Sequence, residues 1–471
     1  MRAVLTVILA VLVSRPLVCN AQQSGAGIEG KWFGRLDAGV VKLRTGLDII
    51  RDGDNYRVDF YSLDQTPDPI SMEKVQYDGT ILSFEKLSLR LSYSGTLVEG
   101  GTRLKGIAVQ GLPRQLILDR VDAFPELVRP QTPKPPFPYT AVNVEYENHS
   151  VGNNLAGTLT IPHRGKRLTS AILITGSGRQ DRDATLMGHK PFWVIADYLT
   201  RHGIAVLRVD DRGIGGSDVG PGNETSVDFA SDVAAGVEFL RNHPRIHDNR
   251  IWLIGHSEGG YIAPMVAAAD KRIEGIVSLA GTAVTGKEIL VEQNRLIRGA
   301  QGVPRETLEW FMPLYEELTE IAVREGDLEQ ARLKSKAALD RRLSAAPIEL
   351  QFASAVLSAE VDAIAKQLQS NWMKYFIVHD PAEDWRQTRC HVLAVFGEKD
   401  LQVPAKQNAP VMASLLANRP RGKYAILEYE SLNHLMQHAE TGNVSEYSTI
   451  EETIAEDVLE QMLQFILGEN S

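Results

Sequence analysis

One short stretch, residues 251–260, limits the fold of this chain more than any other. It reads Ile-Trp-Leu-Ile-Gly-His-Ser-Glu-Gly-Gly, an apolar run that ends in Gly-x-Ser-x-Gly with Ser257 at the centre. The residues that follow, 261–269, suit a helix. A strand, a tight turn and a helix in this order make a nucleophile elbow, which holds a serine oxygen away from the backbone. Gly255 and Gly259 let the strand and the helix meet closely because they carry no Cβ. We therefore expect Ser257 at such an elbow, in preference to an ordinary turn.

Around this stretch, apolar runs typical of buried strands alternate with helical patterns. The expected strands are 142–146, 155–161, 171–175, 204–209, 251–255, 273–279, 391–397 and 424–429, and the expected helices are 191–201, 227–242, 404–416 and 450–467. The first two strands are expected to pair antiparallel. The alternation predicts an α/β fold, a mostly parallel sheet with helices on both faces.

The alternation stops between 282 and 389, where apolar residues recur at helical spacing without strand patterns. Pro313 should start, kink or break a helix there. An all-helical insertion of this kind predicts a cap over the edge of the sheet where ligands bind in open α/β folds. Trp372, Tyr375 and Phe376 are candidates for lining a pocket under the cap, although packing is the ordinary role of such aromatic residues.

The chain before the alternating region has a different character. Short runs with a period of two and the turns Asp52-Gly53, Asp78-Gly79 and Gly100-Gly101 predict an all-β barrel or sandwich. A proline-rich stretch predicts an extended spacer. We thus expect a signal peptide at 1–21, a β domain at 22–124, a linker at 125–139, an α/β core at 140–281 and 390–471, and a helical cap at 282–389.

The first residues have the pattern of a secretory signal. Arg2 precedes an apolar stretch, 3–13, that is too short to span a bilayer, and cleavage is expected after Ala21. A lipid anchor on Cys19 and a buried N-terminal strand are the less favoured alternatives. We expect an exported protein, periplasmic or secreted, without a membrane span.

The charge and the cysteine content limit the possible partners and disulfides. The net charge of −10 disfavours a nucleic-acid partner, which would need a basic face. Cys390 would be the single cysteine after signal removal, so the mature chain would have no internal disulfide, and a small buried hydrophobe is its expected role. The sequence leaves open whether the protein forms a homo-oligomer through the N-terminal domain or the cap.

A serine nucleophile needs a base, and the base needs a group that orients it. Asp400 follows the strand expected at 391–397 and is our candidate for the orienting carboxylate, with Glu398 as its rival. His434 follows the last expected strand and is our candidate base, with His438 as its rival. The order Ser, Asp, His is the order of a catalytic triad on this type of sheet.

The oxyanion of an acyl-transfer intermediate needs preorganised N–H donors. One candidate is the backbone amide of Glu258, directly after the nucleophile. The other comes from the loop Thr175-Gly176-Ser177-Gly178, where we favour the amide of Ser177 and then that of Gly178. His256 is expected to pack beneath the elbow, and we expect no metal and no organic cofactor.

At these residues the chain resembles the α/β-hydrolase superfamily over about 141–468. Two further segments, 175–183 with Gly-Ser-Gly-Arg-Gln-Asp-Arg-Asp and 208–215 with Asp-Asp-Arg-Gly-Ile-Gly, are similar to a bacterial group of capped serine esterases with an N-terminal β domain. Gln180 departs from that pattern, where proline is common. The resemblance implies hydrolysis of carboxylic esters with short acyl chains. For Asp181, Arg182, Asp183 and Arg212 a loop-bracing ion-pair network is favoured over substrate contact.

Three functions follow as hypotheses. The first is a serine esterase acting on a small ester through an acyl-enzyme. The second is a peptidase or amidase with the same triad, and the third, of another class, is an exported ligand-binding protein with the hydrolase fold as scaffold. A dinucleotide site at 213–216 is rejected because Asp218 stands where the phosphate-binding pattern requires its third glycine.

Overall fold

The computed structural model describes residues 27–37, 42–64, 69–110, 112–419 and 422–468. The signal peptide expected at 1–21 lies outside these residues. The described chain divides into two compact units: the first holds the residues up to Asp37 and Leu43–Phe124, and the second begins at Pro125. Each unit has its own hydrophobic core.

The first unit is all-β, as predicted. Its strands in the described residues are β1 Gly30–Asp37, β2 Lys42–Asp52, β3 Asn55–Ser62, β4 Ile70–Ser71, β5 Glu73–Tyr77, β6 Ile81–Lys86, β7 Leu91–Val98, β8 Arg103–Gln110 and β9 Leu112–Val121. They form one sheet in the order β4-β3-β2-β1-β9-β8-β7-β6-β5. Gly53 turns between β2 and β3 with a φ of 63°, and Gly79 between β5 and β6 with a φ of 95°, which explains the glycines in these hairpins. Trp32 is fully buried and its Nε1 donates to the Ile28 carbonyl at 2.9 Å.

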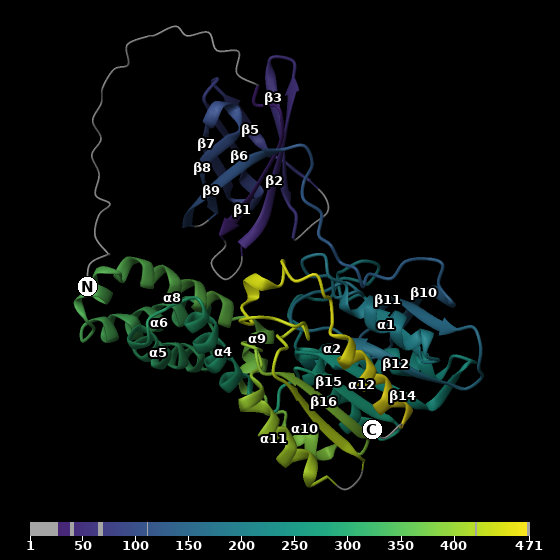
Figure 1. Cartoon of the computed structure of the whole chain (residues 1–471). Helices are drawn as coiled ribbons and strands as arrows, with labels where there is room; N and C mark the ends of the chain where they lie inside the picture. Colours follow the sequence, from purple (N-terminus) through teal and green to yellow (C-terminus); the bar gives the residue numbers. More distant parts are fainter. Residues whose placement is uncertain (1–26, 38–41, 65–68, 111, 420–421, 469–471) are drawn as a thin grey trace, which may run out of the picture. The chain divides into compact units, whose positions relative to one another are not determined.

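The second unit is built on a mostly parallel sheet, shown in Figure 1 from blue through teal to yellow-green. Its strands are β10 Tyr139–Asn148, β11 Asn153–Pro162, β12 Leu168–Ile174, β13 Ala205–Val209, β14 Ile246–His256, β15 Gly275–Leu279, β16 His391–Gly397 and β17 Tyr424–Tyr429. The order is β10-β11-β13-β12-β14-β15-β16-β17. β10, β11 and β13 pair antiparallel, and the pairs from β13 to β17 are parallel. The predicted α/β fold is confirmed.

Helices cover this sheet on both faces. They are α1 Pro191–Arg201, α2 Ser226–Arg241, α3 Glu258–Ala269, α11 Ala405–Ala417 and α12 Glu456–Leu467. α2 contacts α3 on one face, and α1 contacts α12 on the other. Because parallel strands point the same way, the loops after β12, β14, β16 and β17 open at one edge of the sheet.

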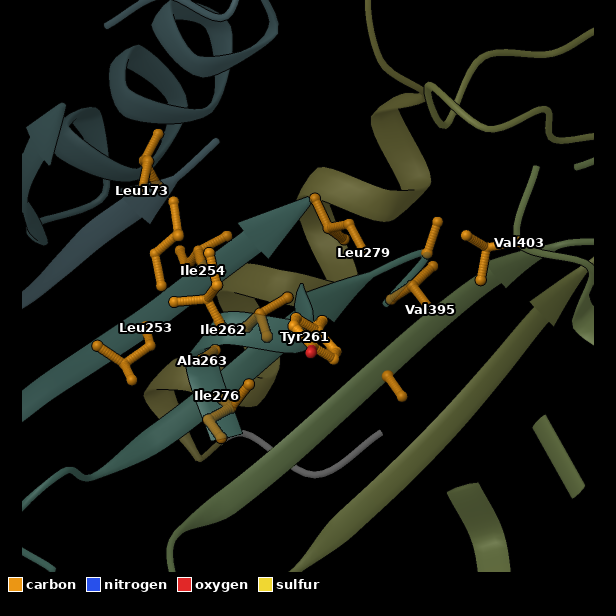
Figure 2. Packing of buried hydrophobic residues seen from close by; sticks show 14 of the residues in the cluster. Leu173, Leu253, Ile254, Tyr261, Ile262, Ala263, Ile276, Leu279, Val395 and Val403 are labelled. Carbon is orange, nitrogen blue, oxygen red and sulfur yellow. The ribbon is translucent and has the colours of Figure 1, made fainter. Parts of the chain in front are cut away.

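The helix that follows the elbow is the most deeply packed of these elements. Figure 2 shows Tyr261 and Ile262 of α3 among Ile254 of β14, Leu279 of β15 and Val395 of β16. All five side chains are buried. Burying one such side chain contributes about 1.5–3 kcal/mol. The start of α3, and the serine before it, are therefore held by the core.

The insertion between β15 and β16 is helical, as predicted, and is shown in green in Figure 1. Its helices are α4 Gly286–Ala300, α5 Arg305–Arg324, α6 Leu328–Leu343, α7 Ile348–Phe352, α8 Ser354–Leu368, α9 Asn371–Val378 and α10 Ala382–Gln387. α5 runs through Pro313, so this residue neither starts nor ends a helix. The residues on both sides, Met312 and Leu314, are buried, and their packing outweighs the lost backbone hydrogen bond.

One expectation near the end of the second unit needs correction. The last helix begins at Glu456 and not at 450, because the amides before it are bonded elsewhere: Ile454 N–H donates to the side chain of Gln131 at 3.1 Å, and Ala455 N–H to the Met436 carbonyl at 2.8 Å. The proline-rich stretch is bonded to the same segment, because Gln131 also donates to the Ile454 carbonyl at 2.7 Å. Arg129 reaches the Ile450 carbonyl at 2.9 Å.

Candidate active site

Ser257 lies at the turn between β14 and α3 that the sequence predicts. Its φ of 54° and ψ of −115° belong to a strained conformation that few residues with a side chain adopt. A Cβ on Gly255 would overlap the backbone of Gly259, and a Cβ on Gly259 would overlap the Ile174 carbonyl. The N–H of Ser257 donates to the Leu279 carbonyl at 2.8 Å. Both glycines are required because strand and helix touch at this point.

Asp400 and His434 meet at the same edge of the sheet. His434 Nδ1 donates to Asp400 Oδ2 at 2.8 Å, and both residues are buried, with 4% and 1% of their surface exposed. Asp400 Oδ1 accepts from the amides of Gln402 at 2.7 Å and Val403 at 2.9 Å. Backbone amides thus fix the carboxylate, and the carboxylate fixes the tautomer of His434 that leaves Nε2 free to accept a proton.

The two rival residues lie elsewhere. Glu398 is exposed at the end of β16. His438 is bound to Glu452 through Nδ1 at 2.9 Å, with 54% of its side chain exposed. Neither lines the cavity described next.

Ser257 and His434 line one cavity of about 510 Å³. Of the three cap aromatics named from the sequence, Trp372 and Phe376 line it, and Tyr375 does not. The hydroxyl of Tyr375 instead bonds His379 Nδ1 at 2.9 Å. The helical insertion therefore supplies part of the wall, as a cap should.

His256 connects the elbow to the base. Its Nε2 donates to the backbone carbonyl of His434 at 2.8 Å, and the two rings lie 4.8 Å apart between centroids. Burial lowers the pKa of His256 to about 4, so the ring is neutral near pH 7. The expected packing role is thus joined by a specific bond that holds the loop carrying His434.

The loop between β12 and α1 lies against the elbow. A Cβ on Gly176 would come within 3.3 Å of the Ser257 Cβ. Ser177 lines the same cavity as Ser257, whereas Gly178, with a φ of 91°, lines a separate cavity of about 50 Å³. Glu258 is the first residue of α3, and amides in the first turn of a helix have no partner within it. Of the candidate donors, Glu258 and Ser177 line the cavity of Ser257, and Gly178 does not.

The side chain of Glu258 has a role that the sequence did not indicate. Its carboxyl accepts from Ser226 Oγ at 2.7 Å and from Trp372 Nε1 at 2.6 Å, and it also bonds the Ser177 side chain. Burial raises the pKa of Glu258, and these three hydrogen bonds lower it in part. One buried carboxyl therefore ties the elbow to the cap helix α9 and to the β12–α1 loop.

The Asp-Arg-Asp segment braces this loop. Arg182 forms a two-pronged ion pair with Asp210, at 3.0 and 2.6 Å. Asp183 pairs with Arg208, and Asp181 accepts from the amides of residues 183 and 185 at 3.0 Å. None of Asp181, Arg182 and Asp183 lines the catalytic cavity.

Arg212 has a similar structural position. Its guanidinium pairs with Asp232 at 2.5 Å and also reaches the Asp228 carbonyl at 3.2 Å. Arg212 lines the smaller cavity of about 50 Å³ and not the one at Ser257. The favoured reading of these charged residues as a loop brace agrees with their contacts.

Other buried polar residues support His434. Asn433 Oδ1 accepts from the amides of Leu435 at 2.9 Å and Gln437 at 3.1 Å, which stiffens the loop. His189 lines the cavity, and its Nε2 donates to the Tyr447 carbonyl at 3.0 Å. The pairing of His189 with residues more than 250 positions later left no local pattern in the sequence.

Neither a membrane-spanning helix nor a metal-binding cluster is found in the described residues. No helix among them is both long and apolar enough to cross a bilayer. No group of three or more His, Cys, Asp or Glu side chains in the same residues is arranged to hold a metal ion.

The fold and the site define a class of protein. The family model of the Alpha/beta hydrolase family matches residues 171–443, which is more than half of the chain. The chain therefore belongs to the alpha/beta hydrolase family.

Individual proteins that resemble the chain share limited sequence identity with it. Esterase EstD of Thermotoga maritima is 27% identical over 290 residues, which cover 60% of this chain and 58% of that protein. The polyketide transferase grgF of a Penicillium species is 33% identical over 87 residues, 18% of this chain and 30% of the relative. A solved esterase of Pyrococcus furiosus is 12% identical with a TM-score of 0.42, covering 74% of this chain and 98% of that one. The chain spans less than two thirds of both curated relatives.

Proposed function

We propose that the protein is a serine esterase that cleaves small carboxylic esters with short acyl chains. One observation carries this proposal: His434, oriented by Asp400 at 2.8 Å, lines the same cavity as the strained Ser257. The similarity to an esterase of Thermotoga maritima supports the ester as the bond that is cleaved.

In the proposed reaction Ser257 Oγ attacks the ester carbonyl carbon while His434 Nε2 takes its proton. The tetrahedral intermediate collapses, the bond from carbon to the alcohol oxygen breaks, and His434 gives the proton to that oxygen. Water then attacks the acyl-enzyme with His434 as base, which releases the acid and restores Ser257. Asp400 stabilises the imidazolium in both steps.

The developing negative oxygen would be bound by the backbone amides of Glu258 and Ser177, with Gly178 as the alternative donor. Amides fixed before the reaction stabilise this charge without reorganisation, and the loss of one such donor costs about 10²–10³ in kcat. The proposed chemistry uses no metal and no organic cofactor.

A cavity of about 510 Å³, partly walled by Trp372 and Phe376, supports a small substrate. Drug-sized ligands occupy pockets of about 300–1,000 Å³. A short acyl chain and a small alcohol fit the lower part of this range.

The test is a substrate panel of p-nitrophenyl esters with increasing acyl length beside aminoacyl nitroanilides. We expect the highest kcat/KM on short esters, and we expect Ser257→Ala to lower kcat by at least about 10⁴. Circular dichroism should show that the variant is folded. A preference for the anilides would favour the peptidase alternative, and binding without turnover of any compound would favour the binding protein.

We also propose that the protein is exported after cleavage behind Ala21. The N-terminal residue of the exported protein would be Gln22, and a mature protein that retains residues 1–21 would refute this. Self-association through the N-terminal domain or the cap is a further proposal, and sedimentation of the full chain tests it.

A further inference from the structure

The catalytic cavity has hydrogen-bonding side chains near Asp400 and His434. Gln293 of α4, Gln402 and Tyr447 line it together and are called the glutamine wall below. Gln293 Nε2 donates to Gln402 Oε1 at 3.4 Å, and Gln402 Nε2 donates to the Tyr447 hydroxyl at 3.1 Å. The three side chains come from the cap, from the loop after β16 and from the loop after β17.

The position of this wall is set by the backbone of the site. The amide of Gln402 donates to Asp400 Oδ1 at 2.7 Å, so the wall starts two residues after the carboxylate that orients His434. The Tyr447 carbonyl accepts from His189, which is also at the cavity. The glutamine wall is therefore on the side of the base.

The wall keeps unused hydrogen-bonding capacity. A glutamine amide has two N–H donors and a carbonyl acceptor, and a tyrosine hydroxyl can donate and accept. In the contacts of the described residues, the side chain of Gln293 uses one N–H, and the Tyr447 hydroxyl accepts one bond. Burial raises the pKa of Tyr447, so its hydroxyl stays neutral. Gln293 and Gln402 are half-buried and line the cavity, so their remaining donors and acceptors are open to water or a polar ligand there.

The wall on the side of the elbow is different. Trp372 and Phe376 line the cavity there, and Trp372 is tied by its Nε1 to Glu258 at 2.6 Å. Arg179 brings a positive charge to this side, with Glu224 3.8 Å away. The side next to the proposed oxyanion donors thus carries aromatic side chains and one charge, whereas the glutamine wall next to the base is polar and uncharged.

The chemistry assigns a substrate part to each side. Because His434 returns its proton to the oxygen of the leaving alcohol, that alcohol must lie on the side of the base. We propose that the glutamine wall is the alcohol subsite and that it selects an uncharged alcohol with a further hydroxyl or amide group, such as a polyol monoester. This inference rests on the proposed esterase function and adds the class of alcohol to it.

The test compares two esters with the same acyl group, glyceryl monobutyrate and n-propyl butyrate, on the full-length protein. We expect the kcat/KM of the glyceryl ester to be about tenfold higher, which is the effect of about 1.4 kcal/mol. Gln293→Leu should lower the ratio of the two kcat/KM values to about one. Gln464→Leu, on the surface of α12, is the matched control and should leave the ratio as in the wild type.

The possible results separate the two proposals. A wild-type ratio of one or less, or a ratio that Gln293→Leu does not change, would overturn the subsite while p-nitrophenyl butyrate is still hydrolysed. Hydrolysis of no ester at all would refute the esterase itself. The wild-type ratio decides the question even if Gln293→Leu does not fold.

Discussion

The edge of the sheet and the helical cap face the same cavity but are held in different ways. At the edge, buried groups are bonded to the backbone: Asp400 receives the amides of Gln402 and Val403, and His256 donates to the His434 carbonyl. On the cap, many contacts are ion pairs on the surface, such as Lys336 with Asp340, where 61% and 55% of the side chains are exposed.

The two kinds of contact differ in how precisely they fix the positions of side chains. Exposed ion pairs contribute about 0–1 kcal/mol and are screened by salt, so they fix little geometry. Buried groups bonded to the backbone hold the reacting atoms to within a fraction of an ångström, which catalysis requires. Under the proposed function, the edge would hold the reacting groups, and the surface of the cap could change with little effect on them, except where Trp372 is bonded to Glu258.

The largest effect is expected at the edge, on the pH dependence of stability. The pKa of His256 is lowered to about 4 in the folded protein from 6.5, so the unfolded chain binds more protons between these values. Stability from this residue is complete above about pH 6.5 and is lost as the pH falls toward 4. Between pH 7 and pH 4.5 we expect wild type to lose about 2.5 kcal/mol more unfolding free energy than His256→Gln.

Urea unfolding of the two proteins at both pH values measures this difference. Asp211 acts with the opposite sign: burial raises its pKa to about 7, so this residue stabilises the folded protein more as the pH falls. Because Asp211 is present in both proteins, its contribution cancels in the difference between them. Lys336→Met on the cap is the control and should follow the wild type. Equal losses in wild type and His256→Gln would contradict a neutral, buried His256.

A smaller effect is expected where edge and cap meet. Glu258→Leu removes the carboxyl that accepts from Trp372 Nε1 and from the two serine hydroxyls, so these donors lose their partner. We expect kcat on a short ester to fall about tenfold, the effect of about 1.4 kcal/mol.

A double-mutant cycle tells positioning from simple destabilisation. If Glu258 acts by holding Trp372, then Trp372→Phe should cost much less in the Glu258→Leu background than in the wild type. Glu360→Leu, which removes a cap carboxylate bound to Arg298, serves as the matched control with unchanged kcat. Additive losses in the cycle would show that the Glu258–Trp372 bond does not position the site.

The edge could be predicted closely because each of its residues follows a strand with a clear pattern. The strands at 391–397 and 424–429 were predicted with their observed ends, and Asp400 and His434 follow from them. The strand at 391–397 is a buried apolar run, and the one at 424–429 is a short partly apolar run at the edge of the sheet; both have sharp boundaries, so the residues after each run can be placed.

The cap and its supports could be predicted only in outline. The helices were expected, but the pairing of Trp372 with Glu258 joins residues 114 positions apart and has no local signature. The docking of Gln131 onto the start of α12 is of the same kind, and it moved the start of that helix to Glu456. Tertiary contacts of single polar side chains do not repeat, so no periodicity reveals them.

The central claim, that the edge delivers Ser257 as the nucleophile, can be tested by covalent labelling. The full chain is treated with a fluorophosphonate, and the modified peptide is identified by mass spectrometry. We expect one adduct, on Ser257, that blocks ester hydrolysis and is absent from Ser257→Ala. An adduct on another serine, or hydrolysis that continues after Ser257 is fully labelled, would contradict the account.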